Sequence, residues 1–133
     1  RIRFSFATTD VLPAAGQGAL GIEVCADRTD LLESLKTLAD MPTWLAVTAE
    51  RTVSRAMGGS CSMPPAAFTR DKGMLLQAVW GDPASIEQGR ITPLVHAQQT
   101  AVVNTFDEAE ALGEAVALRL RAGGAVWQAN PAA

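Results

Sequence analysis

The order of the hydrophobic patterns constrains the fold of this chain more than any other sequence feature. From about Pro42 to Met57, apolar side chains recur at helical spacing, and the glycine pair that follows is typical of a helix end. Three short β-favouring runs come next, separated by an Asp-Lys-Gly turn and a Gly-Asp-Pro turn. These runs comprise residues 63–71, 74–80 and about 88–98. Turns of this kind favour antiparallel pairing, so the pattern predicts a three-stranded antiparallel sheet.

Two further helices are expected, one before the helix that starts near Pro42 and one after the third β-favouring run. Leucines recur at helical spacing from Thr29 to about Leu38, which predicts a short amphipathic helix. The last helix opens with a capping box, in which Thr105 is the N-cap and Glu108 follows three residues later, and it ends at the glycine pair 123–124. Together these patterns predict an α+β fold in which three helices cover one face of the sheet.

The residues before the first helix predict a strand that belongs elsewhere. Gly18–Val24 is apolar and β-favouring, and a proline-containing loop precedes it, so we expect a buried strand there. The chain opens at Arg1 with another β-like run and without a methionine, which suggests a piece of a longer protein. After the last helix, residues 125–133 give little reason to expect order.

Composition and charge exclude several classes of function. The 133 residues are 48% hydrophobic and 19% charged, which suits one globular domain with an apolar core. The net charge is −3 and the cations are scattered, so we expect no nucleic-acid partner. No apolar run approaches the roughly 18 residues of a membrane span, and the N-terminus lacks a signal-peptide block, which predicts a cytoplasmic protein without membrane contact. With one histidine and two cysteines, we expect no metal site.

The glycine-rich stretch GQGALG, residues 16–21, matches the letters of the dinucleotide-binding fingerprint. That fingerprint requires a strand before the glycines and a helix N-terminus after them, because aligned backbone amides bind the pyrophosphate. Here a proline-containing loop precedes the glycines and a β-favouring run follows them. The context predicts instead that Gly16 and Gly18 form a tight loop that leads into a strand.

A second glycine-rich stretch, GGSCSMP, places Cys61 on a loop between a helix end and a strand. The negative end of a helix macrodipole disfavours a thiolate, which makes Cys61 a poor nucleophile for fast acyl transfer. A single slow alkylation has no such requirement, and its thioether product is stable. An ordinary buried thiol is an equal alternative. On the helix before this loop, Glu50 and Arg51 could form an ion pair with neighbouring elements, but most such charges are solvated, and we expect the same here.

Taken in order, the segments LPAAGQGALGIEV and TAERTVSRAMGGSCSMPPAAF resemble the C-terminal part of the porphobilinogen deaminase (hydroxymethylbilane synthase) family. The resemblance extends over residues 1–124. It implies a parent enzyme of three α/β domains, the third with an antiparallel sheet and helices on one face. Residues 1–26 would then return from the second and first domains, residues 27–124 would form the C-terminal cofactor-anchoring domain, and residues 125–133 would be a tail.

The same resemblance implies a transferase that polymerises four porphobilinogen units into hydroxymethylbilane and releases ammonia. The growing chain would be primed on a dipyrromethane cofactor, held through a thioether to Cys61. Gln17 matches a position beside that cofactor, and Gly16 and Gly18 would shape its loop. In the family, the catalytic aspartate and the substrate-binding Arg and Lys residues lie outside this part. We therefore expect the fragment alone to be inactive and to self-associate, and the parent to be a monomer.

Two other functions stay open on the sequence. One is a non-enzymatic α+β binding or interaction module in which Cys61 is incidental. A covalent pyrrole adduct would distinguish a deaminase from such a module. The other is a thiol hydrolase that uses Cys61 with His96, which iodoacetamide would inactivate rapidly.

Overall fold

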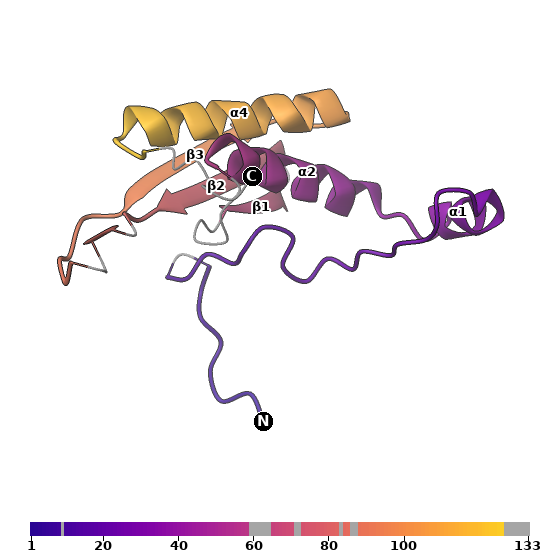
Figure 1. The fold of residues 1–133 in the computed structure, drawn as a ribbon, viewed down its shortest axis with the longest axis horizontal. Coiled ribbons are helices and arrows are strands. Elements are labelled where there is room, and N and C mark those ends of the chain that lie inside the picture. Colours follow the sequence, from indigo (N-terminus) through magenta and orange to yellow (C-terminus); the bar gives the residue numbers. More distant parts are fainter. Residues whose placement is uncertain (9, 59–64, 71–72, 83, 86–87, 127–133) are drawn as a thin grey trace.

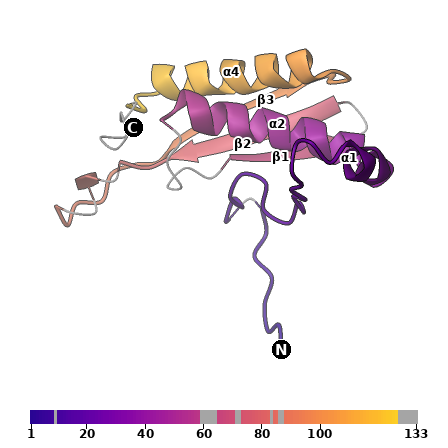
Figure 2. The ribbon, with the colours of Figure 1, turned by 45° about the vertical axis from the view of Figure 1, so that its right-hand side comes forward.

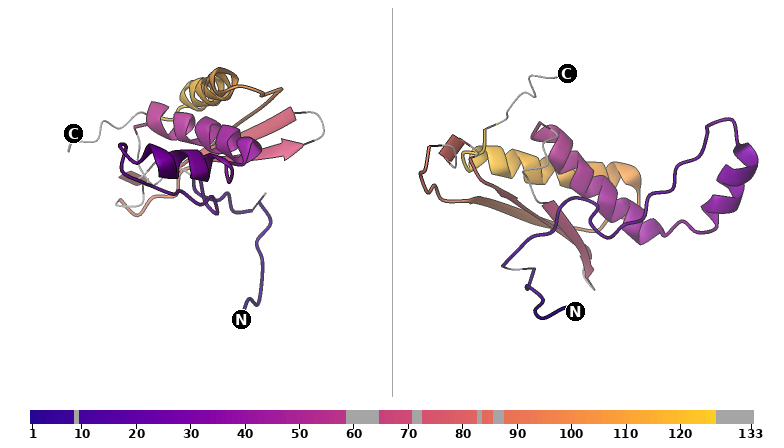
Figure 3. Two further views of the ribbon diagram at one scale, coloured as in Figure 1. Left: turned by 90° about the vertical axis from the view of Figure 1, so that its right-hand side faces the viewer. Right: turned by 60° about the horizontal axis from the view of Figure 1, so that its bottom comes forward.

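The computed structural model describes residues 1–8, 10–58, 65–70, 73–82, 84–85 and 88–126 of the chain. Its elements are, in order, α1 (Thr29–Lys36), α2 (Met41–Ala56), β1 (Pro65–Arg70), β2 (Gly73–Trp80), β3 (Val95–Ala101) and α4 (Phe106–Ala122). Helices α2 and α4 lie side by side over one face of the sheet, whereas α1 lies apart from both (Figure 1). The turned views show the same two layers, helices on one side and strands on the other (Figures 2 and 3).

The sheet has β2 at its centre, with β1 and β3 paired to it antiparallel. Along β2, Met74, Leu76 and Ala78 are buried beneath the helices, as the two-residue alternation of a strand requires. Gln77 falls on the other face, where its amide nitrogen donates to the side-chain oxygen of Gln98, the residue opposite it in β3, at 2.9 Å. The sheet therefore has one apolar face under the helices and a polar pair on the other.

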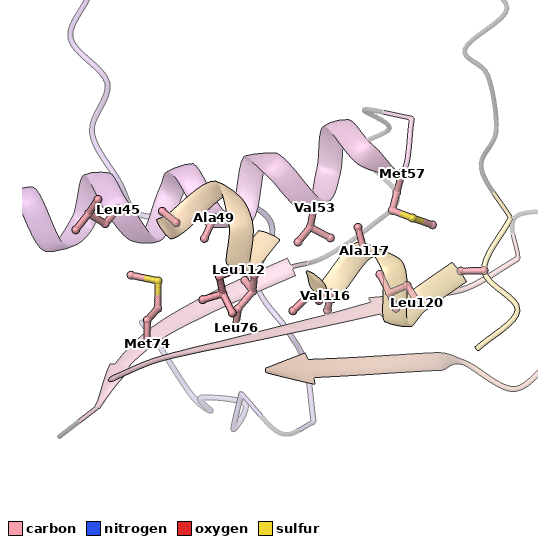
Figure 4. Close-up of a cluster of buried hydrophobic side chains, with 13 residues drawn as sticks. Leu45, Ala49, Val53, Met57, Met74, Leu76, Leu112, Val116, Ala117 and Leu120 are labelled. Atoms are coloured by element: carbon pink, nitrogen blue, oxygen red, sulfur yellow. The ribbon is translucent and has the colours of Figure 1, made fainter. Parts of the chain in front are cut away.

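The hydrophobic core lies between the two long helices and the sheet (Figure 4). Its largest fully buried side chains are Val53, Leu76, Val116 and Leu120. They come from α2, β2 and α4, so the three elements share one core. Full burial of an aliphatic side chain contributes about 1.5–3 kcal/mol each to folding. These contacts fix how α2 sits on the sheet.

Both long helices begin at side-chain caps. Before α2, the Asp40 carboxylate accepts a hydrogen bond from the Thr43 backbone N–H at 2.9 Å. Before α4, the Thr105 hydroxyl accepts from the Glu108 N–H, and the Glu108 carboxylate accepts from the N–H of Asn104 at 2.7 Å. The Glu108 carboxylate also accepts from the Thr105 N–H, which completes the capping box that the sequence predicts.

Helices α2 and α4 approach each other closely at Gly113. A Cβ atom at this position would lie 2.6 Å from the Cβ of Thr52 and 2.7 Å from the carbonyl oxygen of Ala49. Both distances are shorter than real side chains tolerate, and one of the two obstructing atoms belongs to the α2 backbone. Gly113 therefore sets the spacing of the two helices.

The α+β class and the antiparallel sheet are confirmed, but the placement of three helices on one face is wrong for α1. None of the α1 residues is buried, and α1 contacts no other described helix or strand. Its leucines line an apolar groove of about 240 Å³ together with Leu20, Ile22 and Trp44. The amphipathic pattern was therefore correct, but its apolar face does not meet the sheet.

Two strand predictions also differ from the structure. The third strand begins at Val95 rather than near Gln88, because a turn with Gly89 at φ 64° and then Pro93 interrupt the run. The segment 18–24 forms no strand, and Leu20 and Ile22 are exposed rather than buried. A β-favouring run needs a neighbouring strand to satisfy its backbone, and the described part of the chain offers it none.

No helix in the described part of the chain is both long and apolar enough to span a bilayer.

Replacing Gly113 by alanine is expected to destabilise the fold, although alanine is the better helix former. The added methyl would push α4 away from Thr52 and Ala49, and overpacking of this kind costs about 1–3 kcal/mol. Thermal unfolding followed by circular dichroism should show a lower Tm for Gly113→Ala. The neighbouring exposed substitution Glu114→Ala is the control and should leave Tm nearly unchanged. A Gly113→Ala variant as stable as that control would contradict the close approach.

The two helix caps are expected to make the fold sensitive to acid. Hydrogen bonds from Thr43 lower the pKa of the Asp40 carboxyl, and the backbone N–H of Asn104, followed by that of Thr105, lowers the pKa of Glu108. A carboxyl whose pKa is lower in the folded than in the unfolded state stabilises the fold above its unfolded pKa. That stabilisation is lost as pH falls through the folded value.

The double variant Asp40→Asn and Glu108→Gln keeps hydrogen-bonding side chains at both caps and removes their titration. Its Tm should therefore fall less between pH 6 and pH 3 than that of the unmodified chain, in thermal melts across that range. Glu114→Gln, which removes an exposed carboxylate from α4, is the control. Equal acid sensitivity in all three proteins would contradict the role of the caps.

Candidate functional site

The loop predicted from GQGALG consists of two consecutive tight turns. The N–H of Gln17 donates to the carbonyl of Ala14, and the N–H of Ala19 donates to the carbonyl of Gly16, both at 3.0 Å. Gly16 and Gly18 have φ values of 70° and 86°, a region that side-chain-bearing residues rarely adopt. The prediction that Gly16 and Gly18 form a tight loop is therefore confirmed, although no strand follows the loop.

The side chain of Gln17 bonds to its own loop. Its oxygen Oε1 accepts a hydrogen bond from the backbone N–H of Ala14 at 2.9 Å, while the residue itself is exposed. Asn and Gln side chains that bond to nearby backbone in this way rigidify turns. Gln17 is thus held at the tip of the loop with its amide facing solvent.

A buried carboxylate joins this loop to α2. Glu50 is only 8% exposed, and its Oε2 accepts a hydrogen bond from the N–H of Gly16 at 2.6 Å. The short distance is typical of a bond to a charged acceptor, and a carboxylate is buried only where such bonds offset its desolvation. The expectation that Glu50 is solvated is therefore wrong, whereas Arg51 is exposed as expected.

A cleft of about 220 Å³ lies between the loop and α2. Gly16 and Leu20 line it from the loop side, and Trp44, Val47 and Arg51 line it from the helix. Its lining combines apolar surface with one guanidinium group. Such a lining can bind a flat, partly apolar molecule that carries an anionic group.

The other end of α2 leads to the predicted anchor. The helix ends at Ala56 with Met57 as its C-cap, and Gly58 follows with φ 99°. There the guanidinium of Arg121, from the last turn of α4, donates to the carbonyl of Ala56. This bond satisfies a carbonyl that the helix end leaves without an intrahelical partner, and it places a cation at the negative end of the helix dipole.

Cys61 itself lies outside the described residues, as do the rest of positions 59–64. The structure therefore gives no position for the predicted anchor relative to Gln17 or to His96. Cys25 is a free, exposed cysteine, and His96 is exposed on β3. Among the described residues, no three His, Cys, Asp or Glu side chains are arranged to hold a metal ion.

Comparison with known proteins gives one consistent result. Residues 44–122 match the sequence model of the C-terminal domain of porphobilinogen deaminase. The chain is 54% identical over 124 residues to the porphobilinogen deaminase of Albidiferax ferrireducens, covering 92% of this chain and 38% of that protein. It is 46% identical over 127 residues to that of Neisseria meningitidis serogroup A, covering 94% of this chain and 38% of that protein. The chain thus spans well under half the length of these relatives.

Removing the Glu50 carboxylate is expected to release the loop from α2. Glu50→Ala leaves the Gly16 N–H without its acceptor, and loss of a hydrogen bond to a charged group costs about 1.5–3 kcal/mol. Hydrogen exchange followed by NMR should show the Gly16 amide exchanging at least about tenfold faster. Glu50→Gln keeps an oxygen acceptor and should preserve most of the protection.

The exposed substitution Glu114→Ala is the control for this measurement, because it removes a carboxylate that lies on α4. Unchanged exchange at Gly16 in Glu50→Ala would show that the carboxylate does not hold the loop.

Proposed function

Because the chain belongs to the porphobilinogen deaminase family, we propose that it is the cofactor-carrying C-terminal part of a transferase that joins four porphobilinogen units into hydroxymethylbilane with release of ammonia. The observation that carries this proposal is the family match over residues 44–122, which includes most of α2, the sheet and α4. The relatives extend the likeness over more than nine-tenths of the chain, and so to the loop around Gln17.

Cys61 is the proposed attachment point of a dipyrromethane cofactor. Its thiol would add to the carbon that bears the amino group of a porphobilinogen unit. A C–S bond then replaces the C–N bond, and the amine leaves as ammonia with the thiol proton. What supports this assignment is the context before the cysteine, because α2 ends and Gly58 turns the chain just ahead of it. Glycines there leave room for a bulky adduct close to the backbone.

The described residues beside the loop suit such a cofactor. Pyrroles of this kind carry acetate and propionate groups, which are hydrogen-bond acceptors with negative charge. Gln17 is exposed on its loop, and the cleft that the preceding residue, Gly16, helps to line also has Arg51 in its lining. An amide and a guanidinium are suitable partners for carboxylates. When bound, the cofactor supplies the free pyrrole carbon to which the next unit is joined.

Residues 1–26 are proposed to belong to other domains of the parent enzyme, and residues 27–124 to the anchoring domain. In the opening run, Ile2, Phe4 and Phe6 alternate with polar residues and are all at least two-thirds exposed. Leu20 and Ile22 are exposed in the same alternation. Alternating apolar residues of this kind suit strands that pair within another sheet. The tail, residues 125–133, begins at Ala125, which is buried against the core.

The chemistry itself is proposed to depend on the rest of the parent. The chain has 11 basic and 14 acidic residues, a balance that suits an anchoring domain better than a surface that must bind a polycarboxylate alone. The catalytic aspartate and most substrate-binding cations would lie in the first two domains. The proposed parent is a cytoplasmic monomer, and the isolated chain self-associates through its exposed apolar residues.

The first test of this function is the mass of the parent protein. In a host that makes porphobilinogen, the full-length parent should carry a dipyrromethane-sized adduct, visible by intact mass spectrometry and by colour with a pyrrole-specific aldehyde. The Cys61→Ala variant should lack both signals. Cys25→Ala is the matched control and should keep the adduct, because Cys25 lies on the exposed segment before α1. An unmodified parent would instead favour the non-enzymatic binding module.

The chain without the rest of the parent is expected to form no hydroxymethylbilane. Incubation with porphobilinogen, followed by assay of the product after oxidation to porphyrin, should give a signal at the buffer background, while the full-length parent gives product at the same concentration. Product formation by residues 1–133 alone would mean that the catalytic groups lie within this chain.

A further inference from the structure

The two long helices run in the same direction, so their C-terminal ends lie together (Figure 1). At their N-terminal ends, the rings of Trp44 and Phe106 are 5.8 Å apart. At their C-terminal ends, the guanidinium of Arg121 in α4 donates to the carbonyl of Ala56 in α2. Each of these helix ends carries the negative pole of a helix dipole, and a cation there offsets that charge. The bond therefore ties α2 to α4 at the place where α2 ends.

The carbonyls of the last turn of α2 are satisfied partly from within the helix end and partly from α4. The N–H groups of Met57 and Gly58 donate to the carbonyls of residues 53–55, at 3.0–3.2 Å. In a continuing helix, the carbonyl of Ala56 would accept from the N–H four residues later. Arg121 donates to that carbonyl instead. The end of α2 is thus completed by a side chain that lies 65 residues away in the sequence.

This arrangement fixes the chain up to the point where the Cys61 loop begins. Met57 is only 4% exposed and belongs to the core cluster, as does Leu120 beside Arg121 in the sequence (Figure 4). Because Ala56 is bonded to α4 and Met57 is buried, the helix end does not depend on an N–H from positions 59–64. The place from which the chain continues toward Cys61 is therefore set by α2 and α4 together.

We propose that Arg121 is a positioning residue for the transferase reaction, because it fixes the base of the loop that carries Cys61. This inference rests on the proposed function and adds a residue of α4 that acts through the end of α2. A pyrrole chain attached at one point reaches its reacting partner efficiently only if that point has a set place. Porphobilinogen arrives as a free molecule, so its binding does not depend on the attachment point.

Arg119 offers a matched comparison on the same helix. Its guanidinium donates to the carbonyl of Gln98 at 2.9 Å, a bond of the same kind that joins α4 to β3 instead of to α2. Both arginines are exposed residues in the last turn of α4. Substitution by methionine keeps an apolar stem and removes the donor and the charge. A general loss of stability would therefore affect the two methionine variants alike.

The experiment measures kcat and KM for porphobilinogen in the full-length parent, per molecule that carries the adduct by intact mass. Arg121→Met should lower kcat at least about fivefold and leave KM within about twofold, because the attachment point is displaced while binding of the free substrate is unchanged. Arg119→Met should leave both constants within about twofold. Arg121→Lys keeps a cationic donor and should retain kcat within about twofold of the unmodified parent.

Hydrogen exchange followed by mass spectrometry on the same proteins reports on the helix end itself. Residues 53–58 should exchange at least about threefold faster in Arg121→Met than in Arg119→Met, because the Ala56 carbonyl has lost its partner. Loss of the adduct in Arg121→Met alone would support the same role, since attachment uses the same loop.

Equal kcat or equal exchange in Arg121→Met and Arg119→Met would overturn the positioning role and leave the proposed function standing. Failure of Arg121→Lys to retain kcat would overturn it as well. An unmodified parent that forms no product would overturn the proposed function and this inference together.

Discussion

The packing of α2 between two different surfaces is the constraint on which the rest of the structure depends. One side of the helix meets α4 and the sheet through Ala49 and Val53, and the bare Gly113 lets α4 come close. Another side presents the Glu50 carboxylate to the Gly16 amide. The first contact is apolar and extensive, and it fixes the helix. The second is a directed hydrogen bond, and it attaches the loop to that helix. The core thereby sets the position of a polar site that it does not itself contain.

Much of the packed layer was predictable from sequence, since local signals and tertiary contacts agree there. The cap at Thr105, the apolar spacing of α2 and α4, and the β-favouring run of β2 each have a sequence signature that the structure bears out. The wrong predictions concern two segments that do not pack against the sheet. The run at 18–24 has no neighbouring strand in the described chain, and the leucines of α1 line a groove with Trp44 instead of packing on the sheet.

The candidate site divides in the same way. The need for glycine at positions 16 and 18 was visible in the sequence, because only their conformational freedom permits two successive turns. The roles of Glu50 and of the Gln17 oxygen were not visible. Glu50 bonds to a residue 34 positions away, and helical periodicity describes only which side of α2 it occupies. Cys61 was singled out by its glycine-rich context, and it lies outside the described residues.

The buried core also has a consequence for the order in which the protein folds during synthesis. The core cluster runs from Leu45 to Ala125, and among the described residues the three strands pair only with their neighbours in sequence. Such local pairing lowers the mean sequence separation of contacts, which speeds folding. Residues 45–125 can therefore condense as one cooperative unit, without waiting for segments made earlier. The loop at Gly16 can then dock onto a helix that is already in place.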